Sequence, residues 1–190
     1  MVECRWNIPW TREVCSRDPE EVWDDGMQGY GHIYAIKHEA IKCSSLESID
    51  AMMYPQMIGS LMYLTNTRPD ICFAVNTLSQ YLTDTRSVHL IAAKHILRYL
   101  KGTIDYGIKY DGNQKINLEG YVDSDWAGSV IDRKSNSGCC FNTGSCVISW
   151  FSRKQSCVAL RIAEAEYVAA CSASCEAVWL RRLLFDLFDL

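Results

Sequence analysis

The sequence lacks several features that mark special classes of protein. No apolar run approaches the ~18 residues of a transmembrane helix, and the first residues, Met1–Trp6, hold no apolar stretch typical of a signal peptide. We therefore expect no membrane contact and an intracellular location, cytoplasmic or nuclear. Positive charge is also scarce, because 19 Lys and Arg face 23 Asp and Glu. The net charge of −4 excludes a polybasic nucleic-acid tail and a strongly cationic membrane binder.

Zinc and redox motifs are missing as well. No Cys-x-x-Cys pair occurs, and the 4 histidines follow no zinc-ligand spacing. The 10 cysteines are nevertheless many for 190 residues. Several lie in apolar runs such as Ile71–Val75, where cysteine behaves as a small buried hydrophobe. The pattern favours free thiols in a reducing compartment, with a disulfide scaffold as the alternative.

Hydrophobic residues make up 48% of the chain, enough for a packed core. Residues 1–50 show no clean period and stay unassigned. Residues 51–111 are predicted to be helical. Gly59–Leu64 is a compact apolar stretch, and Thr67 with Asp70 three residues later resembles a capped helix start. A further helix is predicted from Ser87 as N-cap to Gly102 as the residue after the last turn.

The helix from Ser87 to Gly102 is expected to be amphipathic. Its predicted apolar face consists of Leu90, Ala93, Ile96, Leu97 and Leu100. Four polar residues are expected to fall mostly off that face: His89, Lys94, Arg98 and Lys101.

Residues 112–190 have the pattern of strands followed by a helix. Tyr106–Tyr110 leads into Asp111–Gly112, a hairpin-turn signal, and 116–122 is the next predicted strand. Strands at 137–142 and 146–151 flank a second turn. From Ala163 to about Leu187 the chain has neither Gly nor Pro, which predicts one long helix. The fold class is therefore α/β (α+β): a helical segment, then antiparallel strands and a long C-terminal helix.

Acidic residues gather around the first predicted strand and the start of the long helix. Asp123 and Asp125 share one face of an extended segment. Glu164 and Glu166 lie two apart on a helix, so only one can face the strand. Glu166 is the better candidate because apolar residues follow on its side, whereas Glu164 is expected to be solvated. Carboxylates at a strand end are a common way to hold a divalent metal, although acidic pairs more often simply face solvent.

Several ordered motifs resemble Copia/Ty-type LTR retrotransposon Pol polyproteins. They run from Tyr54 to Leu184 and comprise Ile58–Leu64, Thr67–Ile71, Ala93–Thr103, Gly120–Gly128, Arg133–Gly138, Ile148–Trp150, Lys154–Gln155, Glu164–Tyr167 and Trp179–Leu184. The resemblance assigns 51–111 to the end of the reverse transcriptase and its connection. It assigns 112–190 to a ribonuclease H-like domain.

The resemblance also implies a catalytic site and a substrate. Asp123 matches the first catalytic Asp and Glu166 the catalytic Glu, and together they would help hold Mg²⁺ or Mn²⁺ for cleavage of RNA in an RNA/DNA hybrid. Asp125 would contribute to the metal site less directly. Four basic residues would meet phosphates of the hybrid, or else form a solvated basic face: Arg133, Lys134, Arg153 and Lys154.

One part of the family pattern is absent from this sequence. The strand that carries the third carboxylate of the family does not follow the long helix. The resemblance therefore implies a truncated unit with weak cation binding, weak or no nuclease activity, and a free sheet edge open to self-association. Two alternatives remain: an active nuclease completed by a partner chain, and an exapted, non-enzymatic interaction or effector-type protein.

Overall fold

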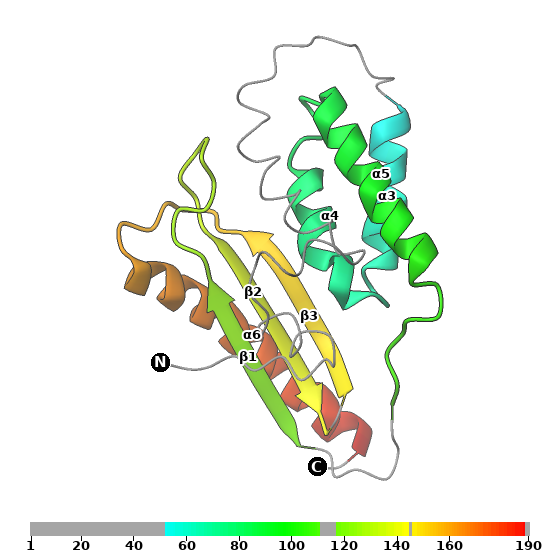
Figure 1. Ribbon diagram of the computed structural model, residues 1–190. Coiled ribbons are helices and arrows are strands. Elements are labelled where there is room, and N and C mark those ends of the chain that lie inside the picture. Colours follow the sequence, from blue (N-terminus) through cyan, green and yellow to red (C-terminus); the bar gives the residue numbers. More distant parts are fainter. Residues whose placement is uncertain (1–51, 111–116, 145, 189–190) are drawn as a thin grey trace, which may run out of the picture. The chain divides into compact units, whose positions relative to one another are not determined.

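The computed structural model describes residues 52–110, 117–144 and 146–188 (Figure 1). The chain divides between Tyr106 and Gly107 into two compact units, and the predicted boundary at 111/112 lies a few residues further along. Residues 1–50 and the predicted turn at Asp111–Gly112 lie outside the described residues. Each unit has its own cluster of buried apolar side chains.

The described part of the first unit is mainly helical, as predicted for this stretch. It contains α3 (Met53–Leu64), the short 3₁₀ helix η1 (Pro69–Ile71), α4 (Cys72–Ser79) and α5 (Ser87–Gly102). Buried side chains from all four elements form one core: Tyr54, Ile58, Leu61, Ile71, Ala74, Val75, Leu78, Ala92, Ala93 and Ile96. Tyr54 closes it with a hydrogen bond from its hydroxyl to the Leu78 carbonyl at 2.9 Å.

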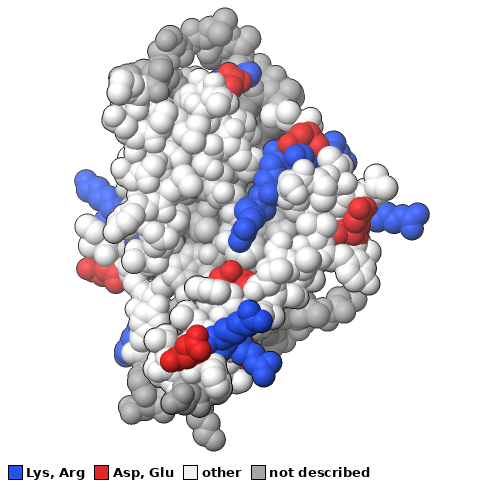
Figure 2. All heavy atoms as spheres, turned by 180° about the vertical axis from the view of Figure 1, so that it is seen from behind, with Lys and Arg blue, Asp and Glu red and all other residues white. Residues whose placement is uncertain are grey.

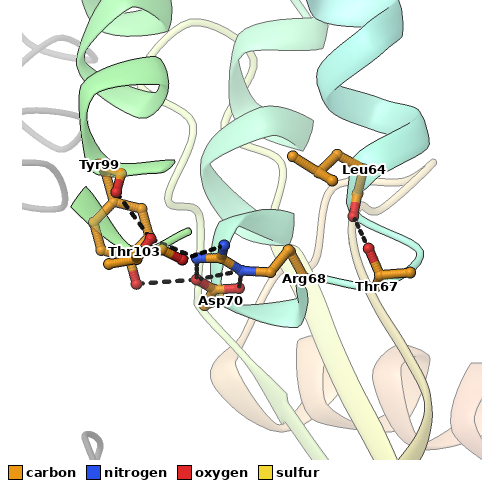
Figure 3. A network of polar contacts seen from close by, with 6 residues as sticks. All are labelled: Leu64, Thr67, Arg68, Asp70, Tyr99 and Thr103. Atoms are coloured by element: carbon orange, nitrogen blue, oxygen red, sulfur yellow. Dashed lines mark hydrogen bonds and ion pairs between the residues drawn. The ribbon is translucent and has the colours of Figure 1, made fainter. Parts of the chain in front are cut away.

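The predicted cap at Thr67 is wrong. Its hydroxyl donates backward to the Leu64 carbonyl at 3.2 Å, and η1 begins after Arg68 without a side-chain cap. Asp70 is held instead by the Arg68 guanidinium, with contacts of 2.6 and 2.9 Å, and by the Tyr99 hydroxyl at 2.9 Å (Figure 3). Arg68 also donates to the Thr103 carbonyl at 3.0 Å. This buried network ties η1 to the end of α5.

The apolar face of α5 also differs from the predicted one. His89 is only 1% exposed and lies in the core, whereas Leu97 is 43% exposed. The imidazole stacks on Tyr81 with ring centroids 4.1 Å apart, and its Nδ1 accepts the Arg86 N–H at 3.1 Å. Sequence position alone suggested an outward polar residue, but a neutral imidazole with an aromatic neighbour packs inside.

The second unit is a three-stranded antiparallel sheet with one long helix, which confirms the mixed α/β class. Strand β1 (Leu118–Ser124) pairs with β2 (Asn136–Thr143), and β2 pairs with β3 (Cys146–Lys154). Helix α6 (Ile162–Phe188) lies behind the sheet in Figure 1 and packs on β1 and β2. The predicted strand at 106–110 is wrong, because these residues have no regular structure.

The core between sheet and helix is small. Cys139 and Phe141 of β2 contact Ala173 and Leu180 of α6. A Cβ at Gly120 of β1 would overlap the Phe141 ring, so glycine leaves the room in which that ring packs. The seven described cysteines are free thiols, three of them buried. No helix in the described part of the chain is long and apolar enough to span a membrane.

Candidate active site

Asp123 and Glu166 come together where β1 ends and α6 begins. Asp123 is exposed near the end of β1, and Glu166 lies half-buried in the second turn of α6. Partial burial raises the pKa of the Glu166 carboxyl above its ordinary value, and the nearby negative charge of Asp123 raises it further. A hydrogen bond from the Ser124 backbone acts in the opposite direction. We call Asp123 and Glu166 the acid pair.

The Ser124 hydrogen bond locates the acid pair at one edge of the sheet. Consecutive N–H groups of a strand point to opposite edges. The Asp125 N–H donates across to the Asn136 carbonyl, at the start of β2, at 3.1 Å. The Ser124 N–H therefore points to the other edge of β1, which has no strand partner among the described residues. The Glu166 carboxylate accepts this N–H, so α6 meets the sheet at the free edge of β1.

Glu164 has a different role from Glu166. It is exposed, and its Oε2 accepts the Leu160 N–H at 2.7 Å. A carboxylate at this place satisfies a backbone donor and interacts favourably with the helix dipole. The structure thus directs Glu166 toward Asp123 and Glu164 toward the preceding loop.

Asp125 is turned away from the acid pair and toward its own loop. Its Oδ1 accepts the Asn136 N–H at 2.6 Å, and its Oδ2 accepts the Asn136 side-chain amide at 3.3 Å. A Cβ at Gly128 would overlap the Asp125 carboxylate, so glycine makes room for it. Ala127 and Arg133 adopt left-handed backbone angles, with φ of 51° and 55°, within this β1–β2 loop. The carboxylate therefore fastens a strained loop.

We predict that Asp125→Ala lowers the stability of the second unit by about 1–3 kcal/mol, because it leaves the buried Asn136 N–H without its acceptor. Cation binding should be unchanged, since the carboxylate faces the loop. Thermal unfolding and Mn²⁺ titration of the variant measure the two effects. A large loss of Mn²⁺ affinity in a fully stable variant would instead make Asp125 a metal ligand.

A buried cluster of polar side chains lies beside the acid pair, and sequence reasoning missed it. Gln155, directly after β3, is 5% exposed and donates through Nε2 to Ser124 Oγ, Ser137 Oγ and the Ala165 carbonyl at 2.9–3.1 Å. Its backbone N–H donates to the Ser135 carbonyl at 2.8 Å. Gln155 stood in the sequence only as part of a family motif, with nothing to signal its burial.

The four predicted phosphate-binding residues do not act as one group. Lys154 pairs with Asp132 at 2.9 Å, and the Arg153 guanidinium lies 3.7 Å from the centroid of the Phe151 ring. Lys134 is half-buried and Arg133 is exposed. Figure 2 shows anionic side chains next to several of the cationic ones. Binding to phosphates stays a prediction for these residues.

The contact with Lys154 is one of several that lower the pKa of the Asp132 carboxyl. Burial would raise the pKa of this carboxyl, but hydrogen bonds from Ser129, Lys154 and the Lys134 backbone, with the Lys154 charge, lower it to about 2. Asp132 is therefore ionised at neutral pH and neutralises part of the charge that Lys154 would offer to a phosphate.

The acid pair offers two carboxylates as candidate ligands for a divalent cation. Mg²⁺ typically binds through one or two carboxylates and keeps several waters, which substrate phosphates can replace. Two close carboxylates, one with a raised pKa, form a site where a cation relieves repulsion. Among the described residues, no group of three or more His, Cys, Asp or Glu side chains could hold a metal, so the acid pair stands without a third such ligand there.

Curated relatives match most of the described chain. The chain is 44% identical over 135 residues to a retrovirus-related Pol polyprotein from transposon TNT 1-94 of Nicotiana tabacum, covering 70% of this chain and 10% of that protein. It is 42% identical over 144 residues to a Pol polyprotein from transposon RE1 of Arabidopsis thaliana, covering 76% and 10%. It is also 44% identical over 128 residues to secreted RxLR effector protein 161 of Plasmopara viticola, covering 67% and 90%.

The transposon relatives, but not the effector, identify the class as retrotransposon Pol proteins. Within it, the chain belongs to the Copia-type Pol polyproteins, and it spans about a tenth of the length of the full polyproteins it matches. Searches against models of protein families and against solved structures found no match.

Proposed function

We propose that this retrotransposon-derived chain carries a ribonuclease H-like site that binds a divalent cation at the acid pair and contacts RNA/DNA hybrid there, with incomplete catalytic machinery of its own. The observation that supports the proposal is the meeting of Asp123 and Glu166 at the free edge of β1. A bound Mg²⁺ or Mn²⁺ would polarise a phosphoryl oxygen and lower the pKa of a coordinated water.

The chain's own residues have separate parts in this proposal. Asp123 is exposed and can reach a phosphate-bound cation from solvent. Glu166 is held on the Ser124 N–H, so its carboxylate is oriented before any ligand arrives. The two carboxylates supply two negative charges, which suit one cation but leave the two-metal arrangement of hybrid-cleaving nucleases short of ligands.

We predict that Asp123→Asn and Glu166→Gln each weaken Mn²⁺ binding by at least about tenfold, because each removes one of two anionic ligands. Isothermal titration of the full chain measures this affinity. Glu164→Gln is the matched control, since it neutralises a carboxylate on the same helix that faces the Leu160 loop. If the acid-pair variants bind Mn²⁺ as well as the unmodified chain does, the proposed site is wrong.

Cleavage of a labelled RNA/DNA hybrid tests the catalytic part of the proposal. The full chain should show little or no cleavage with Mg²⁺ or Mn²⁺. Strong metal-dependent cleavage that is lost in Asp123→Asn would contradict the incompleteness and point to further ligands from a partner chain. The exapted, non-enzymatic alternative makes a different prediction: both acid-pair variants would leave every measured property unchanged.

A further inference from the structure

The side-chain amide of Gln155 joins the two elements that carry the acid pair. Through Nε2 it donates to Ser124 Oγ at 3.1 Å and to the Ala165 carbonyl at 2.9 Å. Ser124 directly follows Asp123, and Ala165 directly precedes Glu166. A third contact, to Ser137 Oγ at 2.9 Å, anchors the same nitrogen to β2.

The orientation of this amide is dictated by the Ala165 carbonyl. The Ser137 hydroxyl can donate or accept and would tolerate either end of the amide, whereas the Ser124 hydroxyl already donates to the Asn136 carbonyl at 3.2 Å. A carbonyl only accepts, and the nitrogen must therefore face Ala165. Two amide hydrogens are shared among three acceptors, while Gln155 Oε1 is buried without a partner in the described structure. A buried oxygen without a hydrogen bond lowers the stability of the fold, yet the amide keeps the orientation in which its nitrogen contacts Ala165.

Another polar contact between the sheet and α6 in the described residues lies further along the helix. Ser149 of β3 donates to Glu176 Oε1 at 2.8 Å, but Glu176 lies ten residues, or about 15 Å of helix rise, beyond Glu166. The apolar contacts of Ala173 and Leu180 with the sheet also lie further along the helix. Gln155 acts at the first turns of α6, where the register of Glu166 against β1 is set.

We propose that Gln155 is a positioning residue for the acid pair: by tying Ser124 to Ala165 it holds the Glu166 carboxylate on the outward Ser124 N–H and beside Asp123. The buried serines around it form a connected network, and such networks limit motion when their members are bonded. The effect of Gln155 on cation binding rests on the proposed function, but its positioning of the Glu166 carboxylate does not.

Amide hydrogen exchange of the full chain tests this inference. Gln155→Met keeps the length and bulk of the side chain but removes both donors. Exchange at the Ser124 amide should accelerate about fivefold or more, because Glu166 no longer covers it. The Asp125 amide, bonded to the Asn136 carbonyl, should change much less and serves as the internal reference. Gln155→Leu, which also removes both amide donors, should show the same effect and replaces Gln155→Met if that variant does not fold.

Ser149→Ala is the matched control, because it removes a different polar contact, from Ser149 of β3 to Glu176 of α6, and should leave Ser124 exchange unchanged. If Ser124 stays protected in a folded Gln155→Met chain, the positioning role is overturned. If protection falls in the Gln155 variants while the unmodified chain binds no Mn²⁺, the positioning role stands and the proposed function fails. If the unmodified chain does bind Mn²⁺, affinity should fall in the Gln155 variants but not in Ser149→Ala.

Discussion

Replacing Arg68 by Met should destabilise the first unit by about 3–5 kcal/mol, the usual result of removing one partner of a buried ion pair. Arg68 is 7% exposed and donates to Asp70 through Nε and Nη2 at 2.9 and 2.6 Å. The variant leaves the buried Asp70 carboxylate with a hydrogen bond from the Tyr99 hydroxyl at 2.9 Å but without its cation. It also releases the Thr103 carbonyl at the end of α5.

Urea denaturation followed through the amide NMR signals of α3, α4 and α5 measures this effect. Asp84→Ala is the control, because it breaks the exposed Arg86–Asp84 pair (3.1 Å), and such pairs contribute at most about 1 kcal/mol. Equal losses in the two variants would show that the Arg68 network does not hold the unit together. Arg68→Lys should recover little stability, because an ammonium cannot reproduce the forked contacts with Asp70 and Thr103.

The first unit should also lose stability between pH 7 and pH 5. Burial lowers the pKa of His89 to about 4, with a further reduction from the Arg86 charge and a small opposing effect of Asp84. Below the ordinary pKa of about 6.5, His89 binds a proton in the unfolded chain but stays neutral in the folded one. Stability is therefore fully present above pH 6.5 and falls as the pH drops toward 4, by roughly 2 kcal/mol at pH 5.

Urea denaturation of the first unit at pH 7.0, 6.0 and 5.0 measures this slope. His89→Gln should flatten it, since glutamine offers an oxygen to the Arg86 N–H but does not titrate. His95→Gln, on the same helix, should keep the slope of the unmodified chain. A slope that persists in His89→Gln but disappears in His95→Gln would reassign the effect to His95.

The sequence predicted those elements that local pattern determines. The hairpin of β2 and β3 follows from alternation around a Gly-containing turn, and α6 follows from 25 residues without Gly or Pro. The strand at 106–110 failed because it relied on one turn signal at Asp111–Gly112. The cap at Thr67 failed because Asp70 contacts Arg68 and Tyr99, and no window of sequence shows that α5 returns to η1.

The candidate site was only partly accessible from the sequence. Residue spacing distinguished Glu166 from Glu164, but the link to Asp123 came from the family resemblance. The alternation of side chains along a strand assigns Asp125 and Asp123 to the same face and does not show that their roles differ. The hydrogen bonds of Asp125 with Asn136 depend on how the β1–β2 loop closes. Gln155 was beyond reach for the same reason, since its acceptors come from β1, β2 and α6.

The Glu166 carboxylate has a second consequence for the sheet. An open strand edge is a template on which other chains can add strands, and proteins commonly block such edges with charged groups. By occupying the outward N–H of Ser124, Glu166 removes one donor from that template and places a negative charge beside it. We therefore expect the carboxylate that would bind a cation also to disfavour the addition of a further strand at the end of β1.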